Sequence, residues 1–168
     1  ISIVVAIVIV VTPFIPWGKF WGTEVEYYED GSKHYETPYR FFKEHGTEIY
    51  YHEDGSKTET PYVNGRRHGT EIYYHEDGSK DWETPYVDDK RHGTEIRYNE
   101  DGSKTETPYV DGKIHGTLIG YREDGSKSSE RPYVDGERHG TAIWYDEDGS
   151  KYLEIVYEND KEISRKKF

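Results

Sequence analysis

Stretches in which apolar and polar residues alternate recur along the chain from residue 21 onward. In one of them, Thr47, Ile49 and Tyr51 fall on one side of an extended backbone, while Glu48 and Tyr50 fall on the other. Alternation with a period of two is typical of a half-buried β-strand. We predict that the Ile49 side is buried, because its residue types hardly change along the chain. The opposite side varies as a solvent-exposed face can.

Two columns of side chains define this predicted packing face, which is also the candidate interaction face. The aliphatic column consists of Val25, Ile49, Ile72, Ile96, Ile119 and Ile143. The tyrosine column consists of Tyr27, Tyr51, Tyr74, Tyr98, Tyr121 and Tyr145. Tyrosine suits such a face because its ring packs while its hydroxyl stays hydrated. The columns could equally serve only to pack the sheet.

The alternating stretches belong to a repeat of 23 or 24 residues. Its copies start at residues 21, 45, 68, 92, 115 and 139, and each contains Gly-Thr and then Asp-Gly-Ser-Lys. Each copy is typical of a hairpin of two short strands. We therefore predict a mainly β fold, a single-layer, solenoid-like antiparallel β-meander of about twelve short strands from six hairpin repeats.

Turn residues refine this prediction. Asp-Gly predicts a tight two-residue hairpin turn, because such turns need a positive φ that glycine supplies. Proline in the second strand, as at Pro61, predicts a bulge or a strand end, because proline has no N–H for the ladder. A bulge would also absorb the extra residue of the 24-residue repeats. The last repeat has Val156 in place of proline and continues to Phe168, which predicts a terminal cap.

These repeats resemble the MORN-type repeat, most closely the variant found in bacterial proteins of the YwqK antitoxin family. The matching elements are His-Gly-Thr, the Tyr-Tyr pair, Asp-Gly and the Tyr-Val-Asp-Gly junction that leads into His-Gly. The resemblance covers about 150 residues. It implies a β-hairpin repeat fold, and it implies a scaffold, a lipid-proximal plate or a protein-binding surface as the function.

Residues 1–18 differ from the repeat domain, residues 19–168, because they carry no charged side chain. As a helix, this apolar segment reaches about 26 Å, close to the ~30 Å hydrocarbon core, which favours a transmembrane anchor. Anchor and interface residues would be Ile3, Ile7, Val10, Phe14, Trp17, Lys19, Phe20 and Trp21. The Ile and Val content also favours a donor strand or a buried edge strand. A signal-peptide remnant is the third reading.

Charge restricts the partners. The net charge of −12 at pH 7 argues against nucleic acid, which needs a basic patch. Few basic residues follow the apolar segment closely, whereas several acidic residues do, so an anchored chain would expose its repeats on the extracytoplasmic side, in the periplasm. An extracellular location is the alternative. The expected partners are protein subunits of a membrane complex and the lipid bilayer.

No pattern in the sequence indicates catalysis or metal binding. Cysteine is absent, which excludes thiol chemistry. Histidines that open the repeats would recur about 10 Å apart, too far to share one metal ion. Asp146, Asp148 and Gly149 lack the spacing of a calcium loop. We predict no catalytic residue, no metal, no cofactor and no enzymatic activity, because no repeat introduces an acid, a base and a nucleophile together.

Three functional hypotheses remain at this point. The first is a membrane-anchored accessory or scaffold subunit that links proteins of a larger complex, for example a photosynthetic, respiratory or envelope assembly. The second is an extracellular filament subunit joined by an N-terminal donor strand. The third is a soluble, antitoxin-like module that binds a protein.

Overall fold

The computed structural model describes residues 17–168. This part of the chain divides into two compact bodies. The N-terminal body runs to Lys80 and also includes Tyr86–Asp89. The C-terminal body comprises Asp81–Pro85 and Lys90–Phe168.

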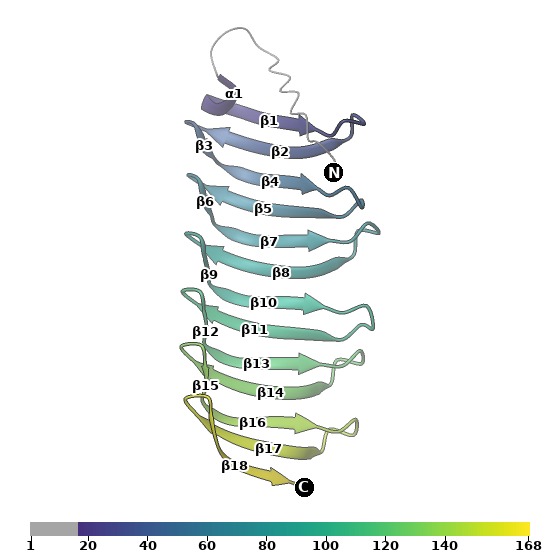
Figure 1. The fold of residues 1–168 in the computed structure, drawn as a ribbon, viewed down its shortest axis with the longest axis vertical. Helices are drawn as coiled ribbons and strands as arrows, with labels where there is room; N and C mark the ends of the chain where they lie inside the picture. The colour runs from purple at the N-terminus through teal and green to yellow at the C-terminus, as the bar shows by residue number, and fades with distance from the viewer. Residues whose placement is uncertain (1–16) are drawn as a thin grey trace. The chain divides into compact units, whose positions relative to one another are not determined.

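The described residues form 18 β-strands and one four-residue helix (Figure 1). The N-terminal body holds α1 (Trp17–Phe20), β1 (Trp21–Tyr27), β2 (Lys33–Arg40), β3 (Lys43–Glu44), β4 (Gly46–Tyr51), β5 (Lys57–Val63), β6 (Arg66–Arg67) and β7 (Gly69–Tyr74). Strand β8 (Lys80–Val87) has residues in both bodies. The C-terminal body holds β9 (Lys90–Arg91), β10 (Gly93–Tyr98), β11 (Lys104–Val110), β12 (Lys113–Ile114), β13 (Gly116–Tyr121), β14 (Lys127–Val134), β15 (Glu137–Arg138), β16 (Gly140–Tyr145), β17 (Lys151–Glu158) and β18 (Lys161–Lys167).

Each repeat forms three strands where the sequence predicts two. In the N-terminal body, β4 pairs antiparallel with β5, and β5 pairs with both the two-residue β6 and with β7. The C-terminal body contains the same arrangement, in which β11 pairs with β10, β12 and β13. The antiparallel meander is therefore present, but the predicted number of about twelve strands is wrong. The residues that follow each junction turn add a short third strand.

The predicted N-terminal apolar helix is also corrected. In the part of the chain that the structure describes, the only helix is α1, which has four residues and leads directly into β1. No helix of residues 17–168 is long and apolar enough to cross a membrane. Residues 1–16, on which most of that prediction rested, lie outside the described residues.

The Asp-Gly turns are three-residue loops, and not the two-residue turns that the sequence predicts. In the second repeat, Gly55 N donates to His52 O at 3.1 Å, and His52 N donates to Ser56 O at 2.9 Å. Gly55 has a φ of 84°, so the loop is a type I turn followed by a left-handed residue. Asp54 accepts hydrogen bonds from the hydroxyl and the N–H of Ser56, and these bonds hold the pKa of Asp54 below its usual range.

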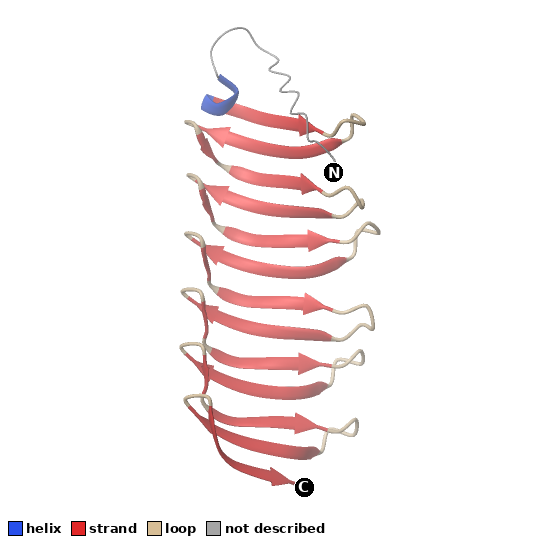
Figure 2. Cartoon of the chain, viewed as in Figure 1, coloured by secondary structure: helices blue, strands red, loops and turns tan. Residues whose placement is uncertain are grey.

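Two-residue turns of positive φ lie at the other end of the hairpins, in the junctions between repeats. Asn64 and Gly65 have φ values of 55° and 82°, as a type I′ turn requires. In each body the loops gather at the two ends of the strands (Figure 2). Hairpin tips therefore occupy one end of the strands, and junctions occupy the other.

Proline is tolerated in the second strand because of the place where that strand changes neighbours. β5 pairs with β7 through residues 57–59 and with β6 through residues 62–63, and Pro61 lies between these stretches. Its missing N–H is not needed there, and its carbonyl accepts a hydrogen bond from His68 N at 2.9 Å. Gly69 then passes over the proline ring with a φ of 117°, and a Cβ at Gly69 would lie 2.9 Å from Pro61 Cγ.

Bulges absorb the extra residue of the longer repeats, as predicted. The register shifts between Glu26 and Tyr27 in the pair of β1 with β2. It shifts again between Gly120 and Tyr121 in the pair of β13 with β14. In the first repeat the bulge turns His34 inward, and this side chain is only 8% exposed.

The best-buried strand residues lie on the face opposite to the predicted one. The register places Glu48 opposite Thr60 and Ile49 opposite Glu59, so these pairs occupy different faces. The face that includes Thr60, called here the Thr–Tyr face, holds the buried strand residues Thr37, Thr60, Thr84, Thr107, Tyr109, Leu118, Ser129, Ala142, Ile155 and Tyr157. The columns on the Ile49 side, called here the Ile–Tyr face, are only half-buried. The predicted assignment of buried and exposed faces is therefore wrong.

Strand β18 ends the C-terminal body and matches the predicted cap. It pairs with β17 from Lys161 to Lys167, and all of its residues are exposed. Its sequence KEISRKK is mostly basic. Charged side chains on an edge strand oppose pairing with another chain, so β18 terminates the meander.

Candidate binding surfaces

On the Ile–Tyr face, four of the six column tyrosines donate a hydrogen bond to a glutamate of the preceding repeat. Tyr98 donates its hydroxyl hydrogen to Glu83 at 2.7 Å, and Tyr121 donates to Glu106 at 3.2 Å. Glu106 also receives the ammonium of Lys104 at 2.8 Å, and the same ammonium lies 4.8 Å from the centre of the Tyr121 ring. Lysine, glutamate and tyrosine thus form a ladder that holds the rings in place beside the isoleucine column.

This ladder changes the acid–base properties of its members. The hydrogen bond to Glu83 and the burial of the ring raise the pKa of Tyr98 to about 12. The hydrogen bond to Glu106 raises the pKa of Lys104 above its usual range. The pKa of Glu130 is lowered, first by its hydrogen bond from Lys127. These groups therefore keep their ordinary charge states at neutral pH, and the face presents fixed charges around half-exposed apolar side chains.

The Thr–Tyr face is held together by a second set of polar contacts. Thr60 donates its hydroxyl hydrogen to Glu71 at 3.1 Å, and Arg67 lies 3.9 Å from the same carboxylate. The guanidinium of Arg67 also stacks over the ring of Tyr86, with its carbon 4.1 Å from the ring centre. Because Arg67 belongs to the short strand β6, the junction itself covers this face. The arrangement recurs in the C-terminal body, where Arg91 lies over the Tyr109 ring at 4.2 Å.

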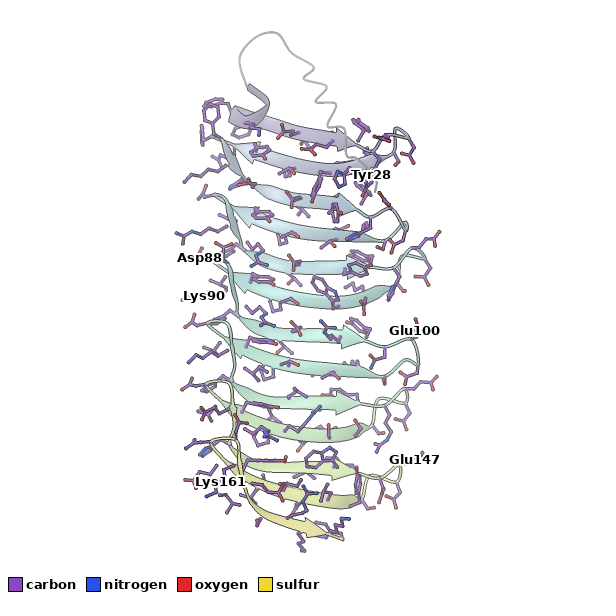
Figure 3. All side chains as sticks on the ribbon, viewed as in Figure 1. Tyr28, Asp88, Lys90, Glu100, Glu147 and Lys161 are labelled. Atoms are coloured by element: carbon purple, nitrogen blue, oxygen red, sulfur yellow. The ribbon has the colours of Figure 1, made fainter. Side chains whose placement is uncertain are left out.

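A stripe of tyrosine and histidine rings follows the hairpin tips of the N-terminal body. Neighbouring ring centres lie 4.3–5.9 Å apart along the stripe of His34, Tyr35, Tyr50, His52, Tyr73 and His75. Beside it, an open groove of about 850 Å³ lies between the first two tips, and Tyr28, His52 and Ser56 are among its lining residues. Tyr28 lies at the tip end and Asp88 lies at the junction end of this body (Figure 3).

The first junction turn of the N-terminal body carries an aromatic cluster. Phe20 from α1 meets Phe41 at 5.3 Å and Phe42 at 5.6 Å between ring centres. Trp21 lies 6.3 Å from Phe41. Trp21, Phe41 and Phe42 are 65%, 55% and 58% exposed. The guanidinium of Arg40 lies 5.2 Å from the Trp21 ring, so the cluster also carries positive charge.

The structure describes only some of the predicted membrane-anchor and interface residues. Lys19, Phe20 and Trp21 lie together, and Lys19 forms an ion pair with Glu24 at 3.1 Å. Trp17 begins α1. The predicted anchor residues outside the described part of the chain are Ile3, Ile7, Val10 and Phe14.

Sequence reasoning missed the contribution of Phe41 and Phe42 to this surface. The signal was present, because these residues stand where other repeats have Asn, Asp or Gly. It also missed the packing role of the tyrosine that follows the second-strand proline, or Val156 in the last repeat. That tyrosine occurs in all six repeats, at Tyr39, Tyr62, Tyr86, Tyr109, Tyr133 and Tyr157.

The described residues contain no group of three or more His, Cys, Asp or Glu side chains that could hold a metal ion.

The family model of the MORN repeat variant matches residues 22–40 and 138–159, in the first and last repeats. The chain thus carries MORN-type repeats. No curated protein matches the chain.

Proposed function

We propose that this MORN-type repeat chain is a non-enzymatic scaffold that binds a protein partner across its Ile–Tyr face. The observation that carries the proposal is the incomplete burial of that face. None of the twelve residues of its two columns is among the buried residues of the described chain, whereas the Thr–Tyr face contains ten buried strand residues. Apolar and aromatic side chains that a fold leaves half-exposed in a regular array are typical of protein-binding surfaces.

The polar surroundings of the columns support the same conclusion. Lys57, Lys104 and Lys151 form ion pairs with a glutamate of their own strand at 2.6, 2.8 and 2.9 Å. A partner that covers the isoleucine and tyrosine columns would meet charges that are already paired, so less desolvation opposes its binding. Tyrosine adds contact area at low cost in side-chain entropy, which favours it in binding surfaces.

The carboxylates of the face are used for structure under this proposal. Glu83, Glu106 and Glu130 each accept a hydrogen bond from a tyrosine hydroxyl. Repetition of the same contact gives no position a distinct catalytic environment. The uncharged stretch 1–18 is the reason to seek the partner in a membrane assembly, where the chain would serve as an accessory subunit.

Neighbouring residues on β10 provide a matched test, because Ile96 lies on the Ile–Tyr face and Arg97 lies on the opposite face. A photo-crosslinking amino acid is introduced at Ile96, Tyr98 or Arg97 of the full chain in its native cells. We expect one discrete protein adduct from Ile96 and Tyr98 and none from Arg97. Ile96→Glu, tested with a crosslinker at Tyr98, is expected to abolish that adduct, whereas Arg97→Ala, which changes the charge by the same amount, is expected to keep it. Equal adducts from both faces, or none from Ile96 and Tyr98, would refute the proposal.

A further inference from the structure

The sequence of the first junction turn differs from that of the junction turns in the other repeats. Other repeats place a valine or glutamate, then two residues drawn from Asn, Asp and Gly, and then a charged residue at this turn. The first repeat has Arg40-Phe41-Phe42-Lys43. Two aromatic residues flanked by two cations therefore replace the turn residues that the backbone favours.

The backbone at this turn opposes the aromatic residues. Phe41 and Phe42 have φ values of 51° and 64°, in the left-handed region. Bulky residues rarely adopt this conformation, because Cβ approaches the following carbonyl oxygen. The fold does not compensate by burying them, since both rings remain more than half exposed. Backbone strain held at an exposed aromatic site indicates a role outside the folding of the chain.

The turn is held rigidly in spite of this strain. Phe41 N donates to Phe20 O, and Phe42 N donates to Lys19 O, each at 2.6 Å. These bonds fix the turn against α1 and bring Trp21 beside the phenylalanine rings. The result is a preformed, exposed aromatic cluster of Trp21, Phe41 and Phe42 at the start of the N-terminal body.

Two exposed cations flank this aromatic cluster, although the chain as a whole has a net charge of −12. Arg40 and Lys43 are exposed on the two sides of the phenylalanine pair, and the Arg40 guanidinium contacts the Trp21 and Phe41 rings at 5.2 and 5.4 Å. Lys19 lies 5.3 Å from the centre of the Tyr39 ring, and its charge is paired with Glu24 at 3.1 Å. Cations that flank exposed aromatic rings match a surface that is apolar inside and anionic outside.

We propose that this aromatic and cationic turn docks on an anionic lipid bilayer, with Trp21, Phe41 and Phe42 among the headgroups. Tryptophan and phenylalanine gain from the region between headgroups and acyl chains, while Arg40 and Lys43 contact lipid phosphates. A bilayer fits better than a protein groove because the rings are more than half exposed and two exposed cations, Arg40 and Lys43, flank them. The proposal uses residues apart from the Ile–Tyr face, so it can fail while the proposed scaffold function holds.

The test uses the full chain and a variant that restores the repeat's own turn, Phe41→Asn with Phe42→Gly. This variant relieves the strained backbone, so a loss of binding cannot arise from unfolding. The chain has no cysteine, which allows a fluorophore on a single introduced cysteine at Thr23, two residues from Trp21 on β1. The matched control carries the label at Thr94, the corresponding exposed position of the fourth repeat. The readout is shielding of the label from acrylamide by vesicles of phosphatidylcholine, with or without 30 mol% phosphatidylglycerol.

We expect anionic vesicles to shield the Thr23 label at least about twofold and to leave the Thr94 label unchanged. The Asn-Gly variant should lose this shielding, and its affinity for anionic vesicles should fall by on the order of tenfold. Tethering by another segment would not restore shielding at Thr23, because the label reports contact at this turn. Full shielding in the Asn-Gly variant would overturn the proposal, as would equal shielding by neutral vesicles. Absence of shielding together with a protein crosslink from position 42 would assign the turn to a protein surface instead.

Discussion

The junction glycines offer a sharp test of how the repeats pack. In the N-terminal body, the junction glycine Gly69 and the hairpin-tip glycine Gly78 both have positive φ, at 117° and 82°. A Cβ at Gly69 would lie 2.9 Å from Pro61 Cγ, whereas a Cβ at Gly78 would meet nothing within 4 Å. Substitution by alanine therefore adds a backbone penalty at both sites, but it adds a steric penalty only at Gly69.

The magnitudes follow from these two terms. A positive φ costs an L-residue about 1–2 kcal/mol, and overpacking typically costs about 1–3 kcal/mol. We expect Gly69→Ala to lower the free energy of unfolding by about 2–5 kcal/mol and Gly78→Ala to lower it by about 1–2 kcal/mol. The larger loss is a substantial part of the total stability of a domain, which is roughly 5–15 kcal/mol.

Urea unfolding of the two variants, followed by circular dichroism, measures the difference. Amide hydrogen exchange in β5 and β7 then locates the loss in the strands that meet at this junction. Pro61→Ala in the Gly69→Ala background removes the Cγ atom and should recover part of the steric term, which a double-mutant cycle detects. The reasoning fails if Gly69→Ala costs no more than Gly78→Ala, or if Pro61→Ala gives no recovery.

Four further outcomes are expected. Burial raises the pKa of Glu48, so the folded state favours the protonated form; Glu48→Gln should stabilise the chain at pH 7, and the gain should vanish towards pH 3. The pKa of Glu130 is lowered in the folded state. Its carboxylate therefore stabilises the fold above the ordinary carboxyl pKa of about 4.3, and this stabilisation disappears as the pH falls through the lowered value. Glu130→Gln should destabilise the chain at pH 7 and lose its effect towards pH 3, in urea titrations across this range. Phe41→Asn with Phe42→Gly should raise the free energy of unfolding by about 1–3 kcal/mol, and a decrease would contradict the assigned strain. Exchange of the four Lys and Arg residues of β18 for threonine should cause concentration-dependent association in analytical ultracentrifugation, and a strictly monomeric variant would refute the capping role.

The repeat and its first strands could be predicted because local signals agree there. Alternation around Ile49, the glycine of each tip and the extra residue near His34 each have a direct structural counterpart. The third strand could not be predicted, because two residues such as Arg66 and Arg67 carry no periodicity. The type of the Asp-Gly turns was predicted wrongly for a related reason. Asp-Gly suits both a two-residue and a three-residue loop, and the register of the strands decides between them.

The buried face was misassigned because regular residue types do not determine burial in a thin sheet. Side chains from elsewhere in the chain decide it. Arg67 and Arg91 reach over the Thr–Tyr face from the short junction strands, which sequence periodicity does not reveal. Ile96 stays half-buried, and its neighbour Tyr98 donates a hydrogen bond to Glu83. The regular residue types on that face therefore reflect the Lys–Glu–Tyr ladder as much as they reflect packing.

Repetition itself explains where function can be sought in this chain. A contact that recurs in every repeat can be accounted for by the needs of the sheet, as the pairing of Gly69 with Pro61 shows. A departure that costs stability within one repeat needs a different cause, because the sheet would be more stable without it. The turn of Phe41 and Phe42 meets this criterion, since the residues of five other repeats show what the backbone prefers. The Ile–Tyr face meets a second criterion, because its columns recur and yet remain half-exposed. A partner on that face and a bilayer at that turn would use separate parts of the N-terminal body, so the two could bind at once.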